Sequence, residues 1–339
     1  MTQTRDLVVN VAGVSRWFED VQALTNLTIE VPKGSITVLL GPNGAGKTTA
    51  IRMITGALSP HQGSVSVFGL DPGQPQGEAV RRRCGVVSAK PSLYDRLSGW
   101  DNLRYAAELY DLGRGKATDA RINEAAAQFG IDQALDQQVG GYSTGMKTRL
   151  ALARSVLHEP ELLLLDEPTS GLDPESAVAV LELIRAMTGE GRTVLMCTHL
   201  LLEAEGLADE VVIMQHGTSL VWGAPADLAN SYWPTPVVRL STGIGSDLDH
   251  LADLDQVTSY AREDKTATLE VADLSVVPQL VRRLTERGAD VTAVQPFQPT
   301  LEDLYFAVRR SQGSTADEIP PPQVGTGRPS RSRVAELAR

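Results

Sequence analysis

Short apolar runs alternate with longer segments of helical period over the first two thirds of the chain. Residues 35–40 read SITVLL, a nearly continuous apolar run typical of a strand that is buried on both faces of a parallel sheet. Similar runs recur, separated by segments long enough for crossover helices, at 85–87, 162–165, 193–197 and 210–214. The pattern predicts an α/β domain.

Strand patterns are absent between about residues 95 and 158. Ser98 and Asp101 have the spacing of a helix capping box. The apolar positions that follow recur at the i, i+3, i+4, i+7 spacing of one helix face: Leu103, Ala106, Ala107 and Tyr110. We therefore expect an all-helical insert at about 95–158 within the α/β domain.

The pattern changes after about residue 224. Pro225, Pro234 and Pro236 predict a linker. Strands are expected beyond it at 237–241, 257–261, 266–271 and 290–294. Two amphipathic helices are expected as well, one that ends before Gly288 and one that begins after Thr300. We predict a first domain at 1–230 and a small α+β, βαββαβ-like domain at 236–310. Residues 311–339 are rich in Gly, Pro, Ser and Arg and predict a disordered tail.

Composition excludes several classes of protein. The 339 residues suit one large and one smaller domain, and a formal charge of −11 argues against nucleic acid as the main partner. Cys84 and Cys197 form no paired metal-ligand spacing or disulfide framework, which favours a reduced cytosolic setting. The most apolar run, 162–165, is far shorter than the ~20 residues that span a bilayer. We expect a soluble chain that does not cross a membrane.

A phosphate-binding loop follows the SITVLL run directly. Residues 41–49 read GPNGAGKTT and fit the pattern G-x-x-x-x-G-K-[ST]. The glycines let backbone N–H groups turn towards an anion, and the following helix adds its N-terminal dipole. We expect Lys47 to neutralise the β- and γ-phosphates and the Thr48 hydroxyl to ligate Mg²⁺. The predicted nucleotide-binding residues here are Gly41, Pro42, Asn43, Gly44, Ala45, Gly46, Lys47, Thr48 and Thr49.

Two adjacent carboxylates end a later strand. Residues 162–173 read LLLLDEPTSGLD, which places Asp166 and Glu167 at the edge where α/β sheets bind ligands. Taken alone, such a pair of carboxylates is as often a solvent-exposed strand end as it is part of a functional site. Together with the phosphate-binding loop it predicts a nucleoside triphosphatase, in which Asp166 reaches Mg²⁺ and Glu167 polarises the attacking water.

A capped helix is predicted shortly before that strand. Residues 142–157 read YSTGMKTRLALARSVL, with Ser143 and Gly145 at the helix start. Followed by LLLLDEP, this segment resembles the signature and Walker B strand of the ATP-binding cassette (ABC) family, and the resemblance covers residues 7 to about 228. YSTGM stands where LSGGQ is usual, so Ser143 and Gly145 match while Thr144 and Met146 depart.

The resemblance implies further site residues. In that family two cassettes stack head to tail, and the signature of one closes on the γ-phosphate held by the other, so Ser143 and Gly145 would contact ATP across the dimer. By position, Phe18, with Trp17 as the alternative, would stack on adenine. Asp173 would lie in the loop that crosses the interface, and His199 would touch the γ-phosphate.

One position departs from the family pattern. In the segment GVVSAKPSLYDRLS, Ala89 stands where the family usually has a glutamine that helps to hold Mg²⁺ and the attacking water. A shift of one residue would place Ser88 or Lys90 there instead. Because the other parts of the site match, we do not interpret the chain as an inactive cassette.

The C-terminal region extends the resemblance. PTLEDLYFAV, residues 299–308, looks like the closing helix of drug-export cassettes of the daunorubicin-resistance type. The resemblance implies the ATPase subunit of an ABC exporter. It would act as a cassette homodimer around two MgATP and dock on separately encoded membrane subunits at the inner face of the cell membrane. The alternatives are a non-transport ABC ATPase acting on ribosomes or DNA, and a regulatory cassette of a heterodimeric transporter.

Overall fold

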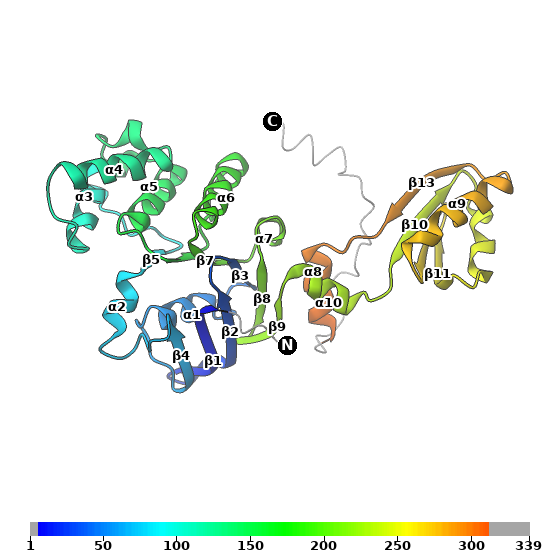
Figure 1. The fold of residues 1–339 in the computed structure, drawn as a ribbon, viewed down its shortest axis with the longest axis horizontal. Coiled ribbons are helices and arrows are strands. Elements are labelled where there is room, and N and C mark those ends of the chain that lie inside the picture. Colours follow the sequence, from blue (N-terminus) through cyan, green and yellow to red (C-terminus); the bar gives the residue numbers. More distant parts are fainter. Residues whose placement is uncertain (1–5, 312–339) are drawn as a thin grey trace. The chain divides into compact units, whose positions relative to one another are not determined.

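The computed structural model describes residues 6–311 of the chain. The chain divides after Pro225 into two compact units. Among the described residues, the first unit contains a six-stranded sheet, a three-stranded sheet and most of the helices, and the second contains a four-stranded sheet (Figure 1). The fold is thus the α/β architecture with an additional α+β unit that the sequence predicts.

The six-stranded sheet positions the residues of the predicted site. Its strand order is β5-β6-β7-β3-β8-β9, and all neighbouring pairs are parallel except β8 and β9. Every residue of β3, β6 and β7 is buried, as expected of continuous apolar runs. Its strands are β3 (Ile36–Leu40), β5 (Cys84–Val87), β6 (Leu162–Asp166), β7 (Thr193–Thr198), β8 (Glu210–Gln215) and β9 (Thr218–Gly223). The strands predicted in the first domain are confirmed.

The predicted helical insert is confirmed as well. It contains α3 (Gly99–Leu109), α4 (Lys116–Gln128) and α5 (Thr144–Val156), with 3-10 turns at Asp132–Ala134 and Val139–Gly141. Ser98 caps α3 because its Oγ accepts a hydrogen bond of 3.0 Å from the backbone N–H of Asp101. The remaining helices of the first unit are α1 (Lys47–Ile54), α2 (Gly77–Arg82), α6 (Pro174–Gly189) and α7 (Leu201–Glu205).

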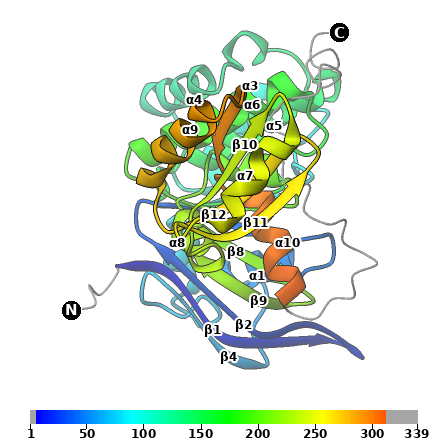
Figure 2. The ribbon, with the colours of Figure 1, turned by 90° about the vertical axis from the view of Figure 1, so that its right-hand side faces the viewer.

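A three-stranded antiparallel sheet was not expected from the sequence. It is formed by β1 (Leu7–Phe18), β2 (Val21–Pro32) and β4 (Gln62–Val67) in the order β2-β1-β4 (Figure 2). The register of β1 against β2 shifts at four places, so the two-residue alternation of buried and exposed side chains is repeatedly interrupted. These interruptions obscure the strand signal in the sequence.

The second unit has its own sheet and core. The sheet is antiparallel with the order β11-β12-β10-β13, and Val238, Leu240, Leu269, Leu280 and Leu284 are fully buried beneath one face. Its elements are α8 (Pro225–Tyr232), β10 (Val237–Thr242), a 3-10 helix η3 (Gly245–Asp253), β11 (Val257–Glu263), β12 (Thr266–Val271), a 3-10 turn η4 (Leu274–Val276), α9 (Val277–Glu286), β13 (Val291–Pro296) and α10 (Leu301–Ser311).

Two details of the second unit differ from the sequence prediction. The segment expected to be a linker begins with helix α8, because a proline such as Pro225 is compatible with the first turn of a helix. Ser311, where the predicted disordered tail begins, is the last residue of α10. The rest of that predicted tail lies outside the described residues.

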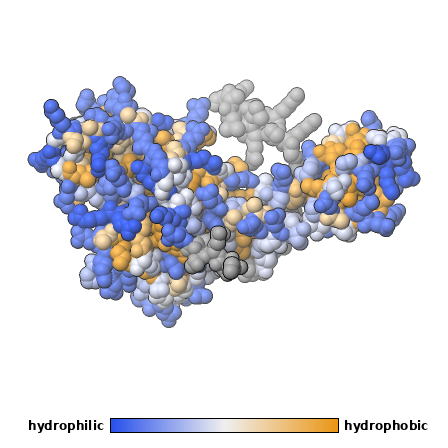
Figure 3. Space-filling view, in the orientation of Figure 1, coloured by the Kyte–Doolittle hydropathy of each residue, from blue (hydrophilic) through white to orange (hydrophobic). Residues whose placement is uncertain are grey.

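The hydropathy of the surface and of the helices indicates whether a segment could span a membrane. On the face shown in Figure 3, hydrophilic residues predominate over the helical insert. Within residues 6–311, none of the helices combines the length and the apolar composition needed to cross a bilayer.

Candidate functional site

The candidate site is assembled at the carboxyl ends of three neighbouring strands. β3 leads into the phosphate-binding loop, β6 ends at Asp166, and β7 is followed by His199. In the parallel register Leu40 lies opposite Thr198, and Asp166 lies opposite Cys197. The fold therefore brings the loop, the two carboxylates and the histidine to one edge of the sheet, where α/β folds bind ligands.

The phosphate-binding loop requires its glycines. Gly44 and Gly46 have φ values of +83° and +100°, which side-chain-bearing residues rarely adopt. A Cβ on Gly46 would lie 2.6 Å from the Leu24 Cδ2 atom, and one on Gly41 would lie 2.5 Å from the Met214 carbonyl oxygen. Helix α1 starts directly after Gly46, so its first N–H groups are available to an anion in the loop.

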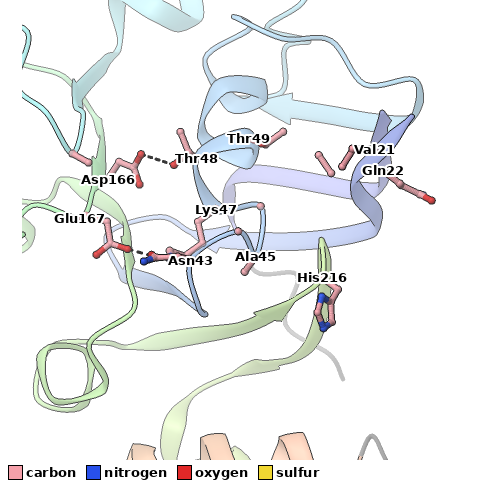
Figure 4. Close-up of a pocket in the computed structure, with 14 residues that line it drawn as sticks. Val21, Gln22, Asn43, Ala45, Lys47, Thr48, Thr49, Asp166, Glu167 and His216 are labelled. Atoms are coloured by element: carbon pink, nitrogen blue, oxygen red, sulfur yellow. Dashed lines mark hydrogen bonds and ion pairs between the residues drawn. The ribbon is translucent and has the colours of Figure 1, made fainter. Parts of the chain in front are cut away.

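A cavity of about 530 Å³ lies against this loop. Figure 4 shows that residues of the loop, of β2 and of the strand end at Asp166 face it from different sides. Its volume falls within the range of ligand-binding pockets. The lining residues are Val21, Gln22, Ala23, Asn43, Gly44, Ala45, Gly46, Lys47, Thr48, Thr49, Ala89, Asp166, Glu167 and His216.

Lys47 is buried and its ammonium group is surrounded by oxygen atoms. Its Nζ donates hydrogen bonds to the carbonyl oxygens of Gly41 and Pro42, at 2.7 and 3.3 Å. The same nitrogen lies 3.2 Å from Glu167 Oε1 (Figure 4). These contacts hold the positive charge of the loop beside the carboxylate that follows β6.

The backbone of Glu167 is held in an unusual conformation. Its φ is +51°, a region that non-glycine residues occupy at a cost of about 1–3 kcal/mol. The conformation is fixed by a hydrogen bond of 2.9 Å from the Glu167 N–H to the carbonyl oxygen of Cys197. Strain of this kind persists where the surrounding structure over-determines it, and it is common at functional sites.

The two oxygens of Glu167 have different surroundings. Oε2 lies 2.7 Å from Nδ1 of His199, and a carboxylate oxygen accepts the proton of such a pair. Oε1 is buried and accepts no hydrogen bond within the described residues, although it is within ion-pair distance of Lys47. A buried oxygen with unused acceptor capacity at the cavity wall can accept a proton from water.

Thr48 and Asp166 form the candidate magnesium site. The Thr48 hydroxyl donates a hydrogen bond of 2.8 Å to Asp166 Oδ2. Burial raises the pKa of the Asp166 carboxyl, and the Thr48 hydrogen bond opposes that shift. No cluster of three His, Cys, Asp or Glu side chains that could hold a metal occurs in the described part of the chain. A hydroxyl and one carboxylate nevertheless fit Mg²⁺, which takes its other oxygen ligands from phosphates and water.

The loop after β5 reaches the cavity through Ala89. The side chain of Ala89 is a methyl group, which can neither ligate a metal nor orient water, as the sequence indicates. The two neighbouring residues, Ser88 and Lys90, are exposed and lie outside the cavity lining, and the Ser88 hydroxyl donates a hydrogen bond of 2.8 Å to the Lys90 carbonyl oxygen.

Several predicted site residues lie outside the cavity lining. They are Phe18, Ser143, Gly145, Asp173 and His199, together with Gly41 and Pro42, whose carbonyl oxygens bind Lys47. Ser143 caps α5 by accepting a hydrogen bond of 3.2 Å from the Met146 N–H, and Asp173 caps α6 by accepting one of 2.9 Å from the Ser176 N–H. A Cβ on Gly145 would lie 3.4 Å from the Ser176 Oγ, so the two helix starts are neighbours.

The two candidate adenine-stacking residues differ in their surroundings. The Trp17 ring packs against His61, with 5.4 Å between the ring centroids. Phe18 is 39% exposed, and the guanidinium of Arg16 lies 5.1 Å from its ring centroid. Phe18 is thus exposed whereas Trp17 is half-buried, which favours Phe18 as the residue that stacks on a nucleotide base.

Sequence reasoning missed four residues of the cavity wall: Val21, Gln22, Ala23 and His216. The turn that carries His216 is fixed to the phosphate-binding loop, because the Gly217 N–H donates a hydrogen bond of 3.1 Å to the Ala45 carbonyl oxygen. On its other side the Gly217 carbonyl oxygen accepts one of 2.9 Å from the Thr25 N–H. The sequence contains no signal for this long-range contact.

Comparisons with known proteins agree with this geometry. The sequence profile of the family described as "ABC transporter" matches residues 24–170. The daunorubicin resistance ATP-binding protein DrrA3 of Streptomyces coeruleorubidus is 34% identical over 305 residues, covering 89% of this chain and 95% of that protein. The Nod factor export ATP-binding protein I of Bradyrhizobium diazoefficiens is 31% identical, covering 89% of this chain and 96% of that protein. A solved structure of the ATP binding subunit of an ABC transporter has a TM-score of 0.60 and 30% identity, covering 66% of this chain and 93% of that one. The resemblance predicted from the sequence is confirmed.

Proposed function

The chain belongs to the family of ABC transporter ATP-binding proteins, which are ATPases coupled to transport, and from this premise we propose that it drives an exporter whose membrane-spanning subunits are separate chains. The relative from Bradyrhizobium diazoefficiens is named for export and the one from Streptomyces coeruleorubidus for daunorubicin resistance. Each similarity covers 89% of this chain, which is more than the first unit alone, so it includes residues of the second unit. This extent supports an exporter of the drug-resistance type.

The observation that carries the catalytic proposal is the surroundings of Glu167. Its Oε1 is buried at the cavity wall, accepts no hydrogen bond within residues 6–311 and lies 3.2 Å from the Lys47 ammonium. We assign Glu167 as the general base that accepts a proton from the attacking water. His199, 2.7 Å from the other oxygen, would hold the carboxylate in place and would contact the γ-phosphate of bound ATP.

The phosphates of ATP would lie in the loop that α1 continues. The backbone N–H groups of Gly44 and Gly46 and the Lys47 ammonium would bind the β- and γ-phosphates. Thr48 and Asp166 would hold Mg²⁺, which supplies positive charge against the phosphoryl oxygens. Phe18 would stack on the adenine ring.

A second cassette would complete the site. Ser143 and Gly145 lie at the start of α5 and outside the cavity lining of their own chain. A helix start with a serine hydroxyl and a glycine N–H can bind an anion, so these residues would contact the γ-phosphate held by another cassette. A homodimer with twofold symmetry would form two such sites at once, with Asp173 near the interface.

A membrane subunit would dock beside the loop that carries Ala89. Large apolar side chains are exposed there on the loop and on α3: Tyr94 is 50%, Tyr105 43% and Leu109 64% exposed. Exposed apolar side chains gathered on one surface are typical of protein contacts. Docking at this place would bring the chain to the inner face of the cell membrane and would connect the partner to the ATP site through Ala89.

The assignment is tested by recovering an affinity-tagged full-length chain from its native cells. We expect it in the membrane fraction, cross-linked to a polytopic protein that has no cassette of its own. Recovery with ribosomes or DNA would instead support a non-transport ABC ATPase. Recovery with a different cassette would support a regulatory role in a heterodimeric transporter.

A further inference from the structure

The second unit contains a cavity of its own, of about 210 Å³. It lies on the face of the sheet formed by β10, β11 and β12, opposite the face that buries the core. Because side chains alternate along a strand, Val238, Leu240 and Leu269 point into the core, while Val237 and Thr268 line the cavity. The cavity is thus separated from the core by the sheet itself.

The floor of the cavity consists of small or short side chains. Ala261 lies opposite Thr268 in the pairing of β11 with β12, and Ser259 lies opposite Glu270. Val237 of the next strand also lies opposite Glu270. These short side chains leave space above the sheet, and a volume of this size suits a ligand of about ten non-hydrogen atoms, below the range of drug-sized pockets.

Two aromatic rings line the cavity. Trp233 follows α8, and Phe297 follows β13. Their ring centroids are 6.0 Å apart and their planes are inclined by 70°, an edge-to-face arrangement. Both side chains are only half-buried, so ring surface is accessible to a ligand. Tryptophan offers the most favourable ring face for an organic cation.

One carboxylate of the cavity favours a positively charged ligand. Glu270 and Asp303 contribute two carboxylates and Arg310 one guanidinium. The Arg239 guanidinium lies near enough to Asp303 to interact with its charge, which leaves Glu270 as the uncompensated carboxylate. Asp303 is partly satisfied, because its Oδ2 accepts hydrogen bonds from the N–H and the hydroxyl of Thr300 at 2.9 and 2.8 Å. The carboxylate of Glu270 has no hydrogen-bond or ion-pair partner among residues 6–311. It is available to an ammonium group.

We propose that this cavity binds a small organic cation that carries an aromatic or apolar body and a single ammonium group. The body would lie against Trp233, Phe297 and Val237, and the ammonium would face Glu270. The site belongs to the second unit and is separate from the ATP cavity, so its occupancy is independent of the proposed function. The pairing of aromatic rings with a free carboxylate is the combination that recognises such cations.

Three probes of nearly equal size separate charge from shape. They are 2-phenylethylammonium, the neutral 2-phenylethanol and the anion 3-phenylpropanoate, each titrated into the full-length protein by calorimetry and ligand-observed NMR. A ligand of this size is expected to bind with a Kd of about 1 mM. We expect the ammonium probe to bind about 5-fold more tightly than the alcohol, and the anion to bind most weakly.

Matched variants identify the carboxylate. Glu270→Gln should weaken binding of the ammonium probe about 5-fold and leave the alcohol unchanged. Glu263→Gln is the control, because Glu263 is exposed on the same face of β11 and does not line the cavity. Phe297→Ala should weaken both probes about 10-fold. Folding of each variant is checked by its unfolding transition.

Several results would overturn the inference. One is the absence of saturable binding of the ammonium probe at concentrations well above its expected Kd. Another is equal or tighter binding of the alcohol or the anion. A third is an ammonium affinity that Glu270→Gln leaves unchanged in a protein that is shown to be folded.

Discussion

The Lys47 ammonium nitrogen lies 3.2 Å from Oε1 of Glu167, so the cation of the phosphate-binding loop and the carboxylate after β6 form an ion pair at the cavity wall. The pair joins two parts of the sequence that are 120 residues apart. It places opposite charges where a γ-phosphate and an attacking water would meet. Changes to the two residues should therefore have different consequences for ATP.

Lys47→Ala should weaken ATP binding. The variant removes the buried ammonium group, which donates hydrogen bonds of 2.7 and 3.3 Å to carbonyl oxygens of the loop. A charge-assisted hydrogen bond from this group to a phosphate contributes about 1.5–3 kcal/mol. The Kd for ATP should rise roughly 10- to 100-fold, measured by calorimetry. Lys116→Ala is the control, because Lys116 is exposed at the start of α4. Equal affinity of both variants for ATP would contradict the assignment of Lys47.

Ala89→Gln should accelerate ATP hydrolysis by the isolated chain. Ala89 lines the cavity but has no polar atom, and a preorganised polar group in an active site typically contributes about 10²- to 10³-fold in rate. We expect a clear increase over wild type in steady-state ATPase assays. A wild-type rate already as fast as that of the variant would show that this site does not need the glutamine.

Lys90→Ala should leave the isolated rate unchanged. Lys90 is exposed beside the cavity and does not line it. With membrane subunits present, we expect the variant to lose part of their stimulation of hydrolysis, because docking would move the loop and bring the lysine towards the phosphates. Full stimulation of Lys90→Ala by the membrane subunits would exclude the lysine from the mechanism.

His158 should make the first unit sensitive to acid. Its ring stacks on Tyr110 at 3.7 Å with an angle of 4°, and its Nε2 lies 2.9 Å from the Cys84 carbonyl oxygen. Burial lowers the pKa of His158 below its usual 6.5, and the contact with the Cys84 carbonyl only partly offsets this. Nδ1 is buried and has no hydrogen-bond partner in the described part of the chain.

The direction of the pH effect follows from that lowered pKa. The unfolded chain takes up the proton first as the pH falls, so the stabilisation present above pH 6.5 is lost between 6.5 and the lower folded pKa. The free energy of unfolding, measured in urea at about pH 7.5 and about pH 5.5, should therefore fall more in wild type than in His158→Gln. An equal decrease in both proteins would show that His158 does not titrate as expected.

The second unit should fold without the first. Residues 226–311 contain a separate core of buried apolar side chains, and none of these residues lines the ATP cavity. The isolated fragment should unfold cooperatively and show no ATP affinity. Leu240→Ala should lower its free energy of unfolding by about 2–5 kcal/mol, whereas the exposed Lys265→Ala should change it by less than about 0.5 kcal/mol. A fragment that is unfolded in native buffer would contradict the prediction.

The sequence predicted those parts of the fold in which local pattern and final environment agree. The runs at Ile36–Leu40 and Leu162–Asp166 are buried on both faces, so their composition alone indicates strands. β1 and β2 are interrupted by shifts in register, and their polar residues obscure the alternation. Helix α8 was predicted as a linker because prolines were interpreted as breaks, although Pro225 occupies a first-turn position.

The candidate site divides in the same way. Lys47, Thr48, Asp166 and Glu167 belong to contiguous motifs, so spacing along the chain was enough to find them. His216 lines the cavity only because Gly217 lies against Ala23 and Ala45, and no local pattern encodes that contact. The ion pair of Lys47 with Glu167 likewise depends on the positive φ of Glu167, which follows from the tertiary structure.

The account depends most directly on Glu167 as the base that activates water, and the decisive measurement is single-turnover hydrolysis of ATP by wild type and Glu167→Gln. Glutamine keeps the size of the side chain but cannot accept the proton, so the rate should fall roughly 10²- to 10⁴-fold. ATP binding should survive, and the variant should accumulate as an ATP-bound dimer in size-exclusion chromatography. A Glu167→Gln protein that hydrolyses ATP at the wild-type rate would contradict the account.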